Sequence, residues 1–185
     1  MPVLISMLRG VNLGPHHRIK MDALRALYES LKLENPRTYV QSGNVVFRTK
    51  ERTLVSLGKR IGAAIEGSCG FRPLVVLRST SEMRGAIAKN PFAERQGIDP
   101  DKLLVTFLAS VPDAEALGKA LAISTDPEEL RINGSEAYIY FPNGMARPKM
   151  SWPRIEKALE TSGTGRNWNT VTKLLEMAEA LEALR

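Results

Sequence analysis

Cysteine, histidine and aromatic residues are scarce in this chain, and each shortage disfavours a class of function. The 185 residues contain one cysteine, two histidines and 6% aromatic residues. The single cysteine, Cys69, cannot form an internal disulfide, which fits a reducing compartment, so we expect a cytoplasmic protein. His16 and His17 are sequence neighbours, and no second histidine or cysteine cluster completes a ligand set, so neither a metal site nor a cofactor is predicted.

Long apolar runs are also missing. No stretch reaches the roughly 20 apolar residues that a membrane-spanning helix needs. The apolar start of the chain has no basic region before it and no small-residue cleavage site after it, so a secretory signal is not expected. With 43% hydrophobic residues the chain can still bury a substantial core, which predicts a globular protein with no membrane partner.

Signatures of known catalytic devices are absent as well. The segment Gly10–Gly14 lacks the glycine spacing of a dinucleotide site and the lysine of a phosphate-binding P-loop. Ser42 lies outside a Gly-x-Ser-x-Gly elbow, and no histidine is placed by sequence to activate it. The catalytic residues are therefore unknown, and the sequence leaves open whether the protein is an enzyme.

Positive charge is concentrated in the N-terminal half. The formal net charge is +6, but residues 1–92 hold 15 Lys or Arg against 6 Asp or Glu, whereas residues 93–185 hold 11 against 14. The halves thus carry +9 and −3. Such a field attracts a polyanion, a phosphorylated ligand or an acidic partner surface.

The first half reads as strand, helix, two strands, helix and strand. The buried run Val3–Leu8 predicts the first strand, and apolar residues at three- and four-residue intervals from Met21 to Leu31 predict the first helix. Two short strands follow, with Ser42-Gly43 at the reversal. A helix over 54–65 and a strand over Arg72–Leu77 complete a βαββαβ order.

The second half repeats that order. A connector with a short helix begins at a capping-box pair, Ser79 and Glu82. Strand 102–110 and helix 111–121 follow, and Asn133-Gly134 predicts a type I′ hairpin turn. The last predicted elements are a helix over Trp152–Leu159, a short strand over Gly163–Trp168 and a helix over 171–181.

The element order predicts an α+β protein made of two ferredoxin-like βαββαβ units with additional helices. We expect the first unit at residues 1–80, a connector with a short helix at 81–101, and the second unit with its C-terminal helix at 102–185. Only the order of elements repeats, because the identity between the halves is faint.

The topology predicts which polar loops meet. In the first unit the hairpin lies at the end of the sheet where the first strand finishes, so Arg9–Asn12 should lie beside Gln41–Asn44. In the second unit, by the same logic, Pro142–Lys149 should lie near Arg166–Asn169. We further expect Asn169 or Thr170 to cap the last helix, whose N-terminus then offers an anion site with Arg166 and Lys149 nearby.

These loops carry the predicted binding residues, and we expect folding to gather them into one positively polarised recess at the mouth of the last helix. Each also has a purely structural interpretation as a cap, a turn or a strand exit. The predicted ligand-binding residues are Arg9, Asn12, Lys20, Gln41, Ser42, Asn44, Asn143, Lys149, Arg166, Asn167 and Asn169.

The favoured function is binding of an anionic ligand, either a nucleotide, a phosphorylated metabolite or a nucleic-acid backbone. Few aromatics lie on the predicted central strands, which disfavours base stacking on the sheet but leaves contact of the loops with phosphates open. One alternative is an enzyme for a small phosphorylated or carboxylated substrate, with Lys20 or Lys149 as electrophile or proton donor. Another is a protein-interaction module. The oligomeric state is unknown.

Five segments together resemble one bacterial family of unknown function. They are LISMLRGVNLG, IKMDALRALYESLKL, RTYVQSGNVVF, YIYFPNG and TGRNWNTVTKLLEM, in that order. They are similar to the domain-of-unknown-function family 1697, over nearly the whole chain. The resemblance implies a compact α+β cytoplasmic protein with two ferredoxin-like units, and it implies no established activity.

Overall fold

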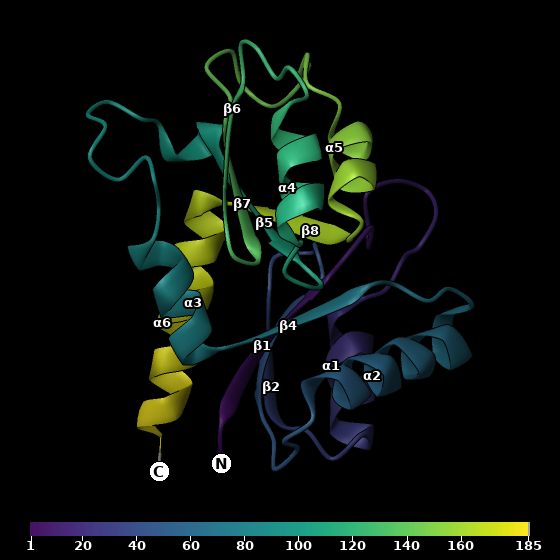
Figure 1. Ribbon diagram of the computed structural model, residues 1–185. Helices are drawn as coiled ribbons and strands as arrows, with labels where there is room; N and C mark the ends of the chain where they lie inside the picture. The colour runs from purple at the N-terminus through teal and green to yellow at the C-terminus, as the bar shows by residue number, and fades with distance from the viewer. Residues whose placement is uncertain (185) are drawn as a thin grey trace. The chain divides into compact units, whose positions relative to one another are not determined.

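The computed structural model describes residues 1–184 and contains two compact units, each built on a four-stranded antiparallel sheet (Figure 1). The first unit comprises Met1–Arg84 and the chain from Lys173 onward, and the second comprises Gly85–Thr172. Each unit has the order βαββαβ followed by one more helix. The expected α+β fold of two ferredoxin-like units with additional helices is therefore confirmed.

The first unit pairs its strands in the order β2-β3-β1-β4. Strand β1 runs antiparallel to β3 and to β4, so the loop after β1, the β2-β3 hairpin and the loop before β4 lie at one end of the sheet. Its elements are β1 (Val3–Leu8), α1 (Met21–Ser30), β2 (Glu34–Tyr39), β3 (Asn44–Arg48), α2 (Leu54–Cys69), β4 (Val75–Ser79) and α3 (Thr80–Ala88).

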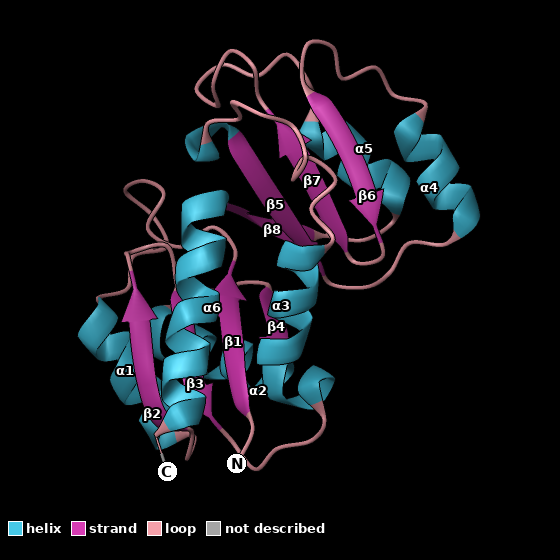
Figure 2. Ribbon diagram, turned by 90° about the vertical axis from the view of Figure 1, so that its left-hand side faces the viewer, coloured by secondary structure: helices cyan, strands magenta, loops and turns pink. Residues whose placement is uncertain are grey.

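Both faces of the first sheet are covered. Helices α1 and α2 lie on one face, and the parts of α3 and α6 (Trp168–Ala183) that belong to this unit lie on the other (Figure 2). All six residues of β1 are buried, because a strand between two helical layers is apolar on both faces. The hydroxyl of Tyr28 lies 2.7 Å from that of Ser6 within this core, and burial raises the pKa of Tyr28.

The second unit pairs its strands in the order β6-β7-β5-β8, with α4 and α5 on one face. The Asp113 side chain caps α4 by accepting the amide hydrogen of Ala116 at 2.8 Å. The elements are the 3-10 turn η1 (Pro100–Lys102), β5 (Leu103–Leu108), α4 (Ala114–Leu121), β6 (Glu129–Asn133), β7 (Glu136–Tyr140), α5 (Trp152–Leu159) and β8 (Gly163–Asn167).

The capping box that begins α3 is confirmed. The carboxylate of Glu82 accepts the backbone N–H of Ser79 at 2.7 Å, and the hydroxyl of Ser79 accepts the backbone N–H of Glu82 at 3.2 Å. These reciprocal bonds satisfy two donors that a helix start otherwise leaves without partners. The helix follows β4 with no intervening residue.

Two local predictions are wrong in detail. Strand β4 begins at Val75, opposite Leu8, rather than at Arg72, because Pro73 has no N–H to donate to the sheet. In the β6-β7 hairpin the last pair is Asn133 with Glu136, so the two-residue loop is Gly134-Ser135. Only Gly134 has positive φ, at 62°, which fits a type II′ turn instead of the expected type I′.

Candidate functional site

Asn12 organises the loop that follows β1. Its side-chain amide donates to the carbonyl oxygens of Ile19 at 2.9 Å and Gln41 at 2.8 Å, and its Oδ1 accepts the Ile19 N–H at 2.9 Å. Its own N–H donates to the carbonyl of His17 at 3.1 Å. The expected meeting of Arg9–Asn12 with Gln41–Asn44 is confirmed, and the polar groups of Asn12 serve to position the main chain of the two loops.

The β2-β3 hairpin is fixed in a similar way. Asn44 is buried, and its side-chain amide donates to the Tyr39 carbonyl at 3.1 Å and to the Ser42 hydroxyl at 2.9 Å. Gly43 has φ of 75°, and a Cβ there would lie 2.8 Å from Cβ of Leu8. The hairpin is thus held close against the end of β1, with Gln41 exposed and Ser42 half-buried at its tip.

A third loop joins the same end of the sheet. The Arg9 N–H donates to the carbonyl of Leu74 at 3.0 Å, and the ring of His17 stacks on that of Phe71, with centroids 4.6 Å apart and planes at 23°. We call this end of the first unit, comprising residues 9–20, 40–43 and 70–74, the basic loop edge. The loop 9–20 is the purple segment that leaves β1 in Figure 1.

The basic loop edge contains four Lys or Arg and no Asp or Glu. Arg9, Arg18 and Lys20 are exposed, and within residues 1–184 no carboxylate pairs with Arg18 or Lys20. Arg72 forms an ion pair with Glu66, with 3.4 Å between a guanidinium nitrogen and a carboxylate oxygen. The side chain of Lys20, which precedes α1, makes no capping hydrogen bond to that helix. The first N–H groups of that helix carry partial positive charge beside Lys20, and the acidic Asp22 in its first turn offsets part of it.

The second unit has the same topology but lacks this positive charge, so the topology does not require it. There the Leu108 N–H donates to the Ser135 carbonyl and the Ala109 N–H to the Ser162 carbonyl, both at 2.8 Å. These bonds correspond to those of Leu8 with Gly43 and of Arg9 with Leu74. The equivalent loops, 109–113, 134–135 and 160–162, contain Asp113 and Glu160 but no Lys or Arg. The same fold thus carries an acidic edge in one unit and a basic edge in the other.

Arg166 does not extend into solvent. It lies on β8 opposite Val105, is 7% exposed, and donates from one guanidinium nitrogen to the Thr164 hydroxyl at 2.7 Å and the Gly165 carbonyl at 2.8 Å. Burial lowers the pKa of Arg166 to about 10. Arg166 is thus a buried charge, unlike the exposed Arg9, Arg18 and Lys20 of the basic loop edge.

Asn167 caps the last helix. Its Oδ1 accepts the N–H of Thr170 at 2.8 Å, because α6 begins at Trp168 directly after β8. The prediction that Asn169 or Thr170 is the cap is therefore wrong by two or three residues. Asn169 instead donates from its side chain to the carboxylate of Asp101 at 2.7 Å.

The loop after β7 contacts Glu128, just before β6, and Lys102, just before β5. The Lys149 N–H donates to both carboxylate oxygens of Glu128, at 3.3 and 3.2 Å, and the Met150 N–H donates to one of them at 2.8 Å. Lys102 donates to the carbonyl of Pro142 at 3.1 Å, while Asn143 is exposed. Turn η1 thus contacts both predicted loops, through Lys102 and Asp101, and lies between them. The expected single recess formed from both units stays a prediction.

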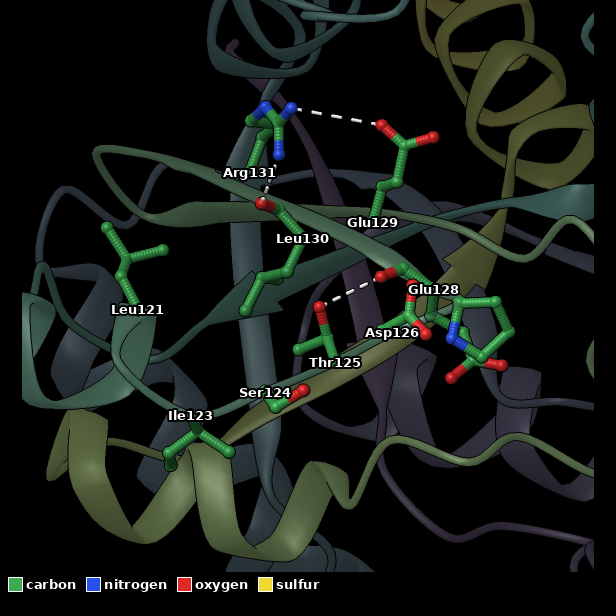
Figure 3. A pocket seen from close by; sticks show the side chains of 10 residues that line it. Leu121, Ile123, Ser124, Thr125, Asp126, Glu128, Glu129, Leu130 and Arg131 are labelled. Carbon is green, nitrogen blue, oxygen red and sulfur yellow. Dashed lines mark hydrogen bonds and ion pairs between the residues drawn. The ribbon is translucent and has the colours of Figure 1, made fainter.

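A groove of about 550 Å³ lies beside the edge strand β6 in the second unit (Figure 3). Carboxylates outnumber the cation in it, and Glu128 already accepts the main-chain donors described above. Its charge does not suit an anion, and no sequence motif marked it. It is lined by Leu121, Ile123, Ser124, Thr125, Asp126, Pro127, Glu128, Glu129, Leu130 and Arg131.

Two further observations bear on the class of site. Among residues 1–184, no group of three or more His, Cys, Asp or Glu side chains is arranged to hold a metal ion. None of the helices in that part of the chain is long and apolar enough to cross a membrane.

The stacked pair of His17 and Phe71 is a feature that sequence reasoning missed. Sequence reasoning considered the two histidines only as possible metal ligands, rejected that role, and gave Phe71 no role. The two residues are 54 positions apart, but the loop after β1 and the loop before β4 must end at one edge of a βαββαβ sheet. The topology that paired Asn12 with Gln41 could therefore also have placed His17 near Phe71.

Comparisons with known proteins agree with this architecture. A solved structure of a conserved bacterial protein from Streptococcus pneumoniae superimposes with a TM-score of 0.73 at 18% sequence identity, covering 97% of this chain and 99% of that one. At that identity the likeness shows the fold alone. No curated protein matches the chain. The sequence model of the family described as "Protein of unknown function (DUF1697)" matches residues 1–138. The chain therefore belongs to the DUF1697 family.

Proposed function

We propose that this protein binds an anionic, phosphate-bearing ligand at the basic loop edge of its first unit. The observation that carries the proposal is the contrast between the two units. Topologically equivalent loops hold four Lys or Arg without an acid in the first unit and two acids without a Lys or Arg in the second. Because the fold tolerates either sign, topology alone does not account for the positive edge.

The loop after β1 is longer than folding requires. It spans residues 9–20, whereas its counterpart in the second unit spans residues 109–113. Long loops on a rigid scaffold are disproportionately sites of binding. Asn12 holds this loop to the hairpin and to Ile19, so Arg18 and Lys20 flank a main-chain position that is fixed by hydrogen bonds. Because the main chain here is already ordered, anion binding has to order only the side chains of Arg18 and Lys20, which lowers its entropic cost.

The cost of desolvation also favours binding of an anion at the basic loop edge over binding at the buried Arg166. Arg166 already donates to a hydroxyl and a carbonyl inside the second unit. Arg18 and Lys20 are exposed, and within residues 1–184 neither pairs with a carboxylate that a ligand would have to displace. A phosphate at this edge thus gains charge-assisted hydrogen bonds without breaking an ion pair at either side chain.

A phosphate-only probe tests the proposal. The affinity of a fluorescently labelled strand of about 12 abasic nucleotides is measured by anisotropy at about 50 mM salt. The double variant Arg18→Ala/Lys20→Ala should bind at least about tenfold more weakly than the wild type. The slope of log affinity against log salt should also become shallower, by about 0.7 for each phosphate that no longer meets a cation.

The matched control is Lys50→Ala/Arg52→Ala. Both control residues are exposed, lie in the first unit after β3 and have no carboxylate partner within residues 1–184. They follow the strand end that pairs with Val3, at the opposite end of the sheet. Equal losses in the two double variants would show that binding follows net charge and not the basic loop edge, and absence of binding by the wild type would reject the function itself.

A further inference from the structure

The stacked rings of His17 and Phe71 form an aromatic feature at the basic loop edge that anion binding alone does not explain. Phe71 packs against the hydrophobic core of the first unit and is only partly exposed, whereas His17 is exposed. The ring planes are inclined by 23° with centroids 4.6 Å apart. One face of the imidazole is thus covered by Phe71, while His17 as a whole residue is exposed.

The backbone holds His17 in this position. Its φ of 55° is in the left-handed region, and its carbonyl accepts the N–H of Asn12 at 3.1 Å. Its sequence neighbours are the exposed His16 and Arg18, and Phe71 is followed by Arg72. The stacked pair is therefore bordered along the chain by the cations Arg18 and Arg72.

Cations beside an exposed aromatic ring match the chemistry of an unpaired nucleotide. Proteins that bind single strands combine positive charge for the backbone with aromatic rings on which bases stack. A metabolite that carries only phosphate gives the ring nothing to contact, and the bases of a duplex are already stacked on each other. We propose that His17 and Phe71 form a platform for a nucleobase, so that the anion bound at the basic loop edge is a single-stranded nucleic acid.

The covered faces of the first sheet support the choice of a loop platform. Recognition modules of this topology stack bases on aromatic residues of the central strands. Here the central strands are buried on both faces: Leu4 and Phe47 lie in the core under α1 and α2, and Ile5 and Met7 are also buried. Aromatic contact with a base is therefore available at the loops and not on the sheet.

The proposal rests on the proposed function, and base removal separates the two. The wild type should bind a labelled single strand of about 12 nucleotides at least about fivefold more tightly than the abasic strand of the same length, because base stacking on one aromatic side chain contributes that factor or more. Equal affinity for the two strands would overturn the platform and leave anion binding intact. Absence of binding to both strands would overturn both proposals.

Variants at the two adjacent histidines locate the effect. His17→Ala should lose about fivefold or more in affinity for the base-bearing strand and change little for the abasic strand. His17→Phe should keep the preference for bases, which distinguishes stacking from general loop damage. His16→Ala is the control, since His16 is also exposed and its ring has no stacking partner within residues 1–184. Equal losses from His16→Ala and His17→Ala, or binding of a duplex as tightly as of the single strand, would overturn the inference.

Discussion

The substitution Asn12→Ala probes the hydrogen bonds that hold the basic loop edge together. It removes three side-chain hydrogen bonds, two to Ile19 and one to Gln41, with lengths of 2.8 to 2.9 Å. A net hydrogen bond contributes about 0.5 to 1.5 kcal/mol, and an alanine at the left-handed φ of 58° costs roughly 1 kcal/mol more. Because one of the bonds is exposed, we expect a loss of about 2 to 4 kcal/mol in the free energy of local opening.

Native-state hydrogen exchange reports on this site directly, because the Ile19 N–H donates to Oδ1 of Asn12. In Asn12→Ala the Ile19 amide should exchange about 30-fold faster or more, since about 2 kcal/mol corresponds to that factor. Asn12→Gly should recover roughly 1 kcal/mol, because glycine adopts positive φ without strain. Asn143→Ala, at an exposed loop position, should leave the exchange of Ile19 unchanged.

Unchanged protection of Ile19 in Asn12→Ala would refute this reasoning. It would mean that the loop keeps its conformation without the carboxamide. The fixed positions of Arg18 and Lys20 would then have some other cause, and the entropic advantage argued for anion binding would no longer follow from Asn12.

Three more predictions concern folding. Gly43→Ala should cost about 2 kcal/mol or more in the free energy of unfolding by urea, because its Cβ would meet Leu8 at 2.8 Å. Gly134→Ala, which has positive φ but open space around the added Cβ, should cost about 1 kcal/mol. Similar losses in the two variants would contradict the steric account. Ser79→Ala should cost about 1 kcal/mol by loss of the capping box, measured against Ser56→Ala at an exposed position of α2. Burial raises the pKa of Tyr28 in the folded state, so the unfolded state loses its proton first and stability falls as pH rises above about 10. Tyr28→Phe should reduce the slope of stability against pH by about 1 kcal/mol per pH unit. An unchanged slope would show that Tyr28 has the same pKa in the folded and unfolded states.

The positions of strands and helices could be predicted from sequence because burial sets the hydrophobic pattern of each element. The run Val3–Leu8 is buried on both faces and so reads as continuous hydrophobicity, and the predicted helix Trp152–Leu159 agrees with α5. The hairpin at Gly134 was recognisable because a tight turn needs positive φ. Its type was not, because Asn133 and Ser135 are both acceptable in such turns and the register decides between them.

The roles of the polar side chains were harder to predict. Asn12 and Asn44 were predicted to bind a ligand, yet their amides contact main-chain and hydroxyl oxygens of their own loops. A carboxamide has the same donors and acceptor whether its partner is a ligand or a turn, so sequence cannot separate the two roles. Arg166 carried a clearer signal, because alternation along β8 places it on the same face as Thr164, which is also buried.

The contrast of charge between the two edges required the structure. Sequence assigned positive charge to the N-terminal half, but only the register and loop contacts show that loops 9–20, 40–43 and 70–74 share one end of a sheet. The same contacts identify loops 109–113, 134–135 and 160–162 as their counterparts. The enzyme and interaction-module alternatives stay predictions.

Mapping the bound probe onto the chain is the most direct test of anion binding at the basic loop edge. Amide chemical shifts of the isotopically labelled full chain are recorded by NMR while the abasic strand of about 12 nucleotides is titrated. We predict that the largest changes fall on residues 9–20, with smaller ones on 40–43 and 70–74. Changes confined to the second unit, or spread evenly over exposed lysines and arginines such as Lys50 and Arg52, would contradict the assignment.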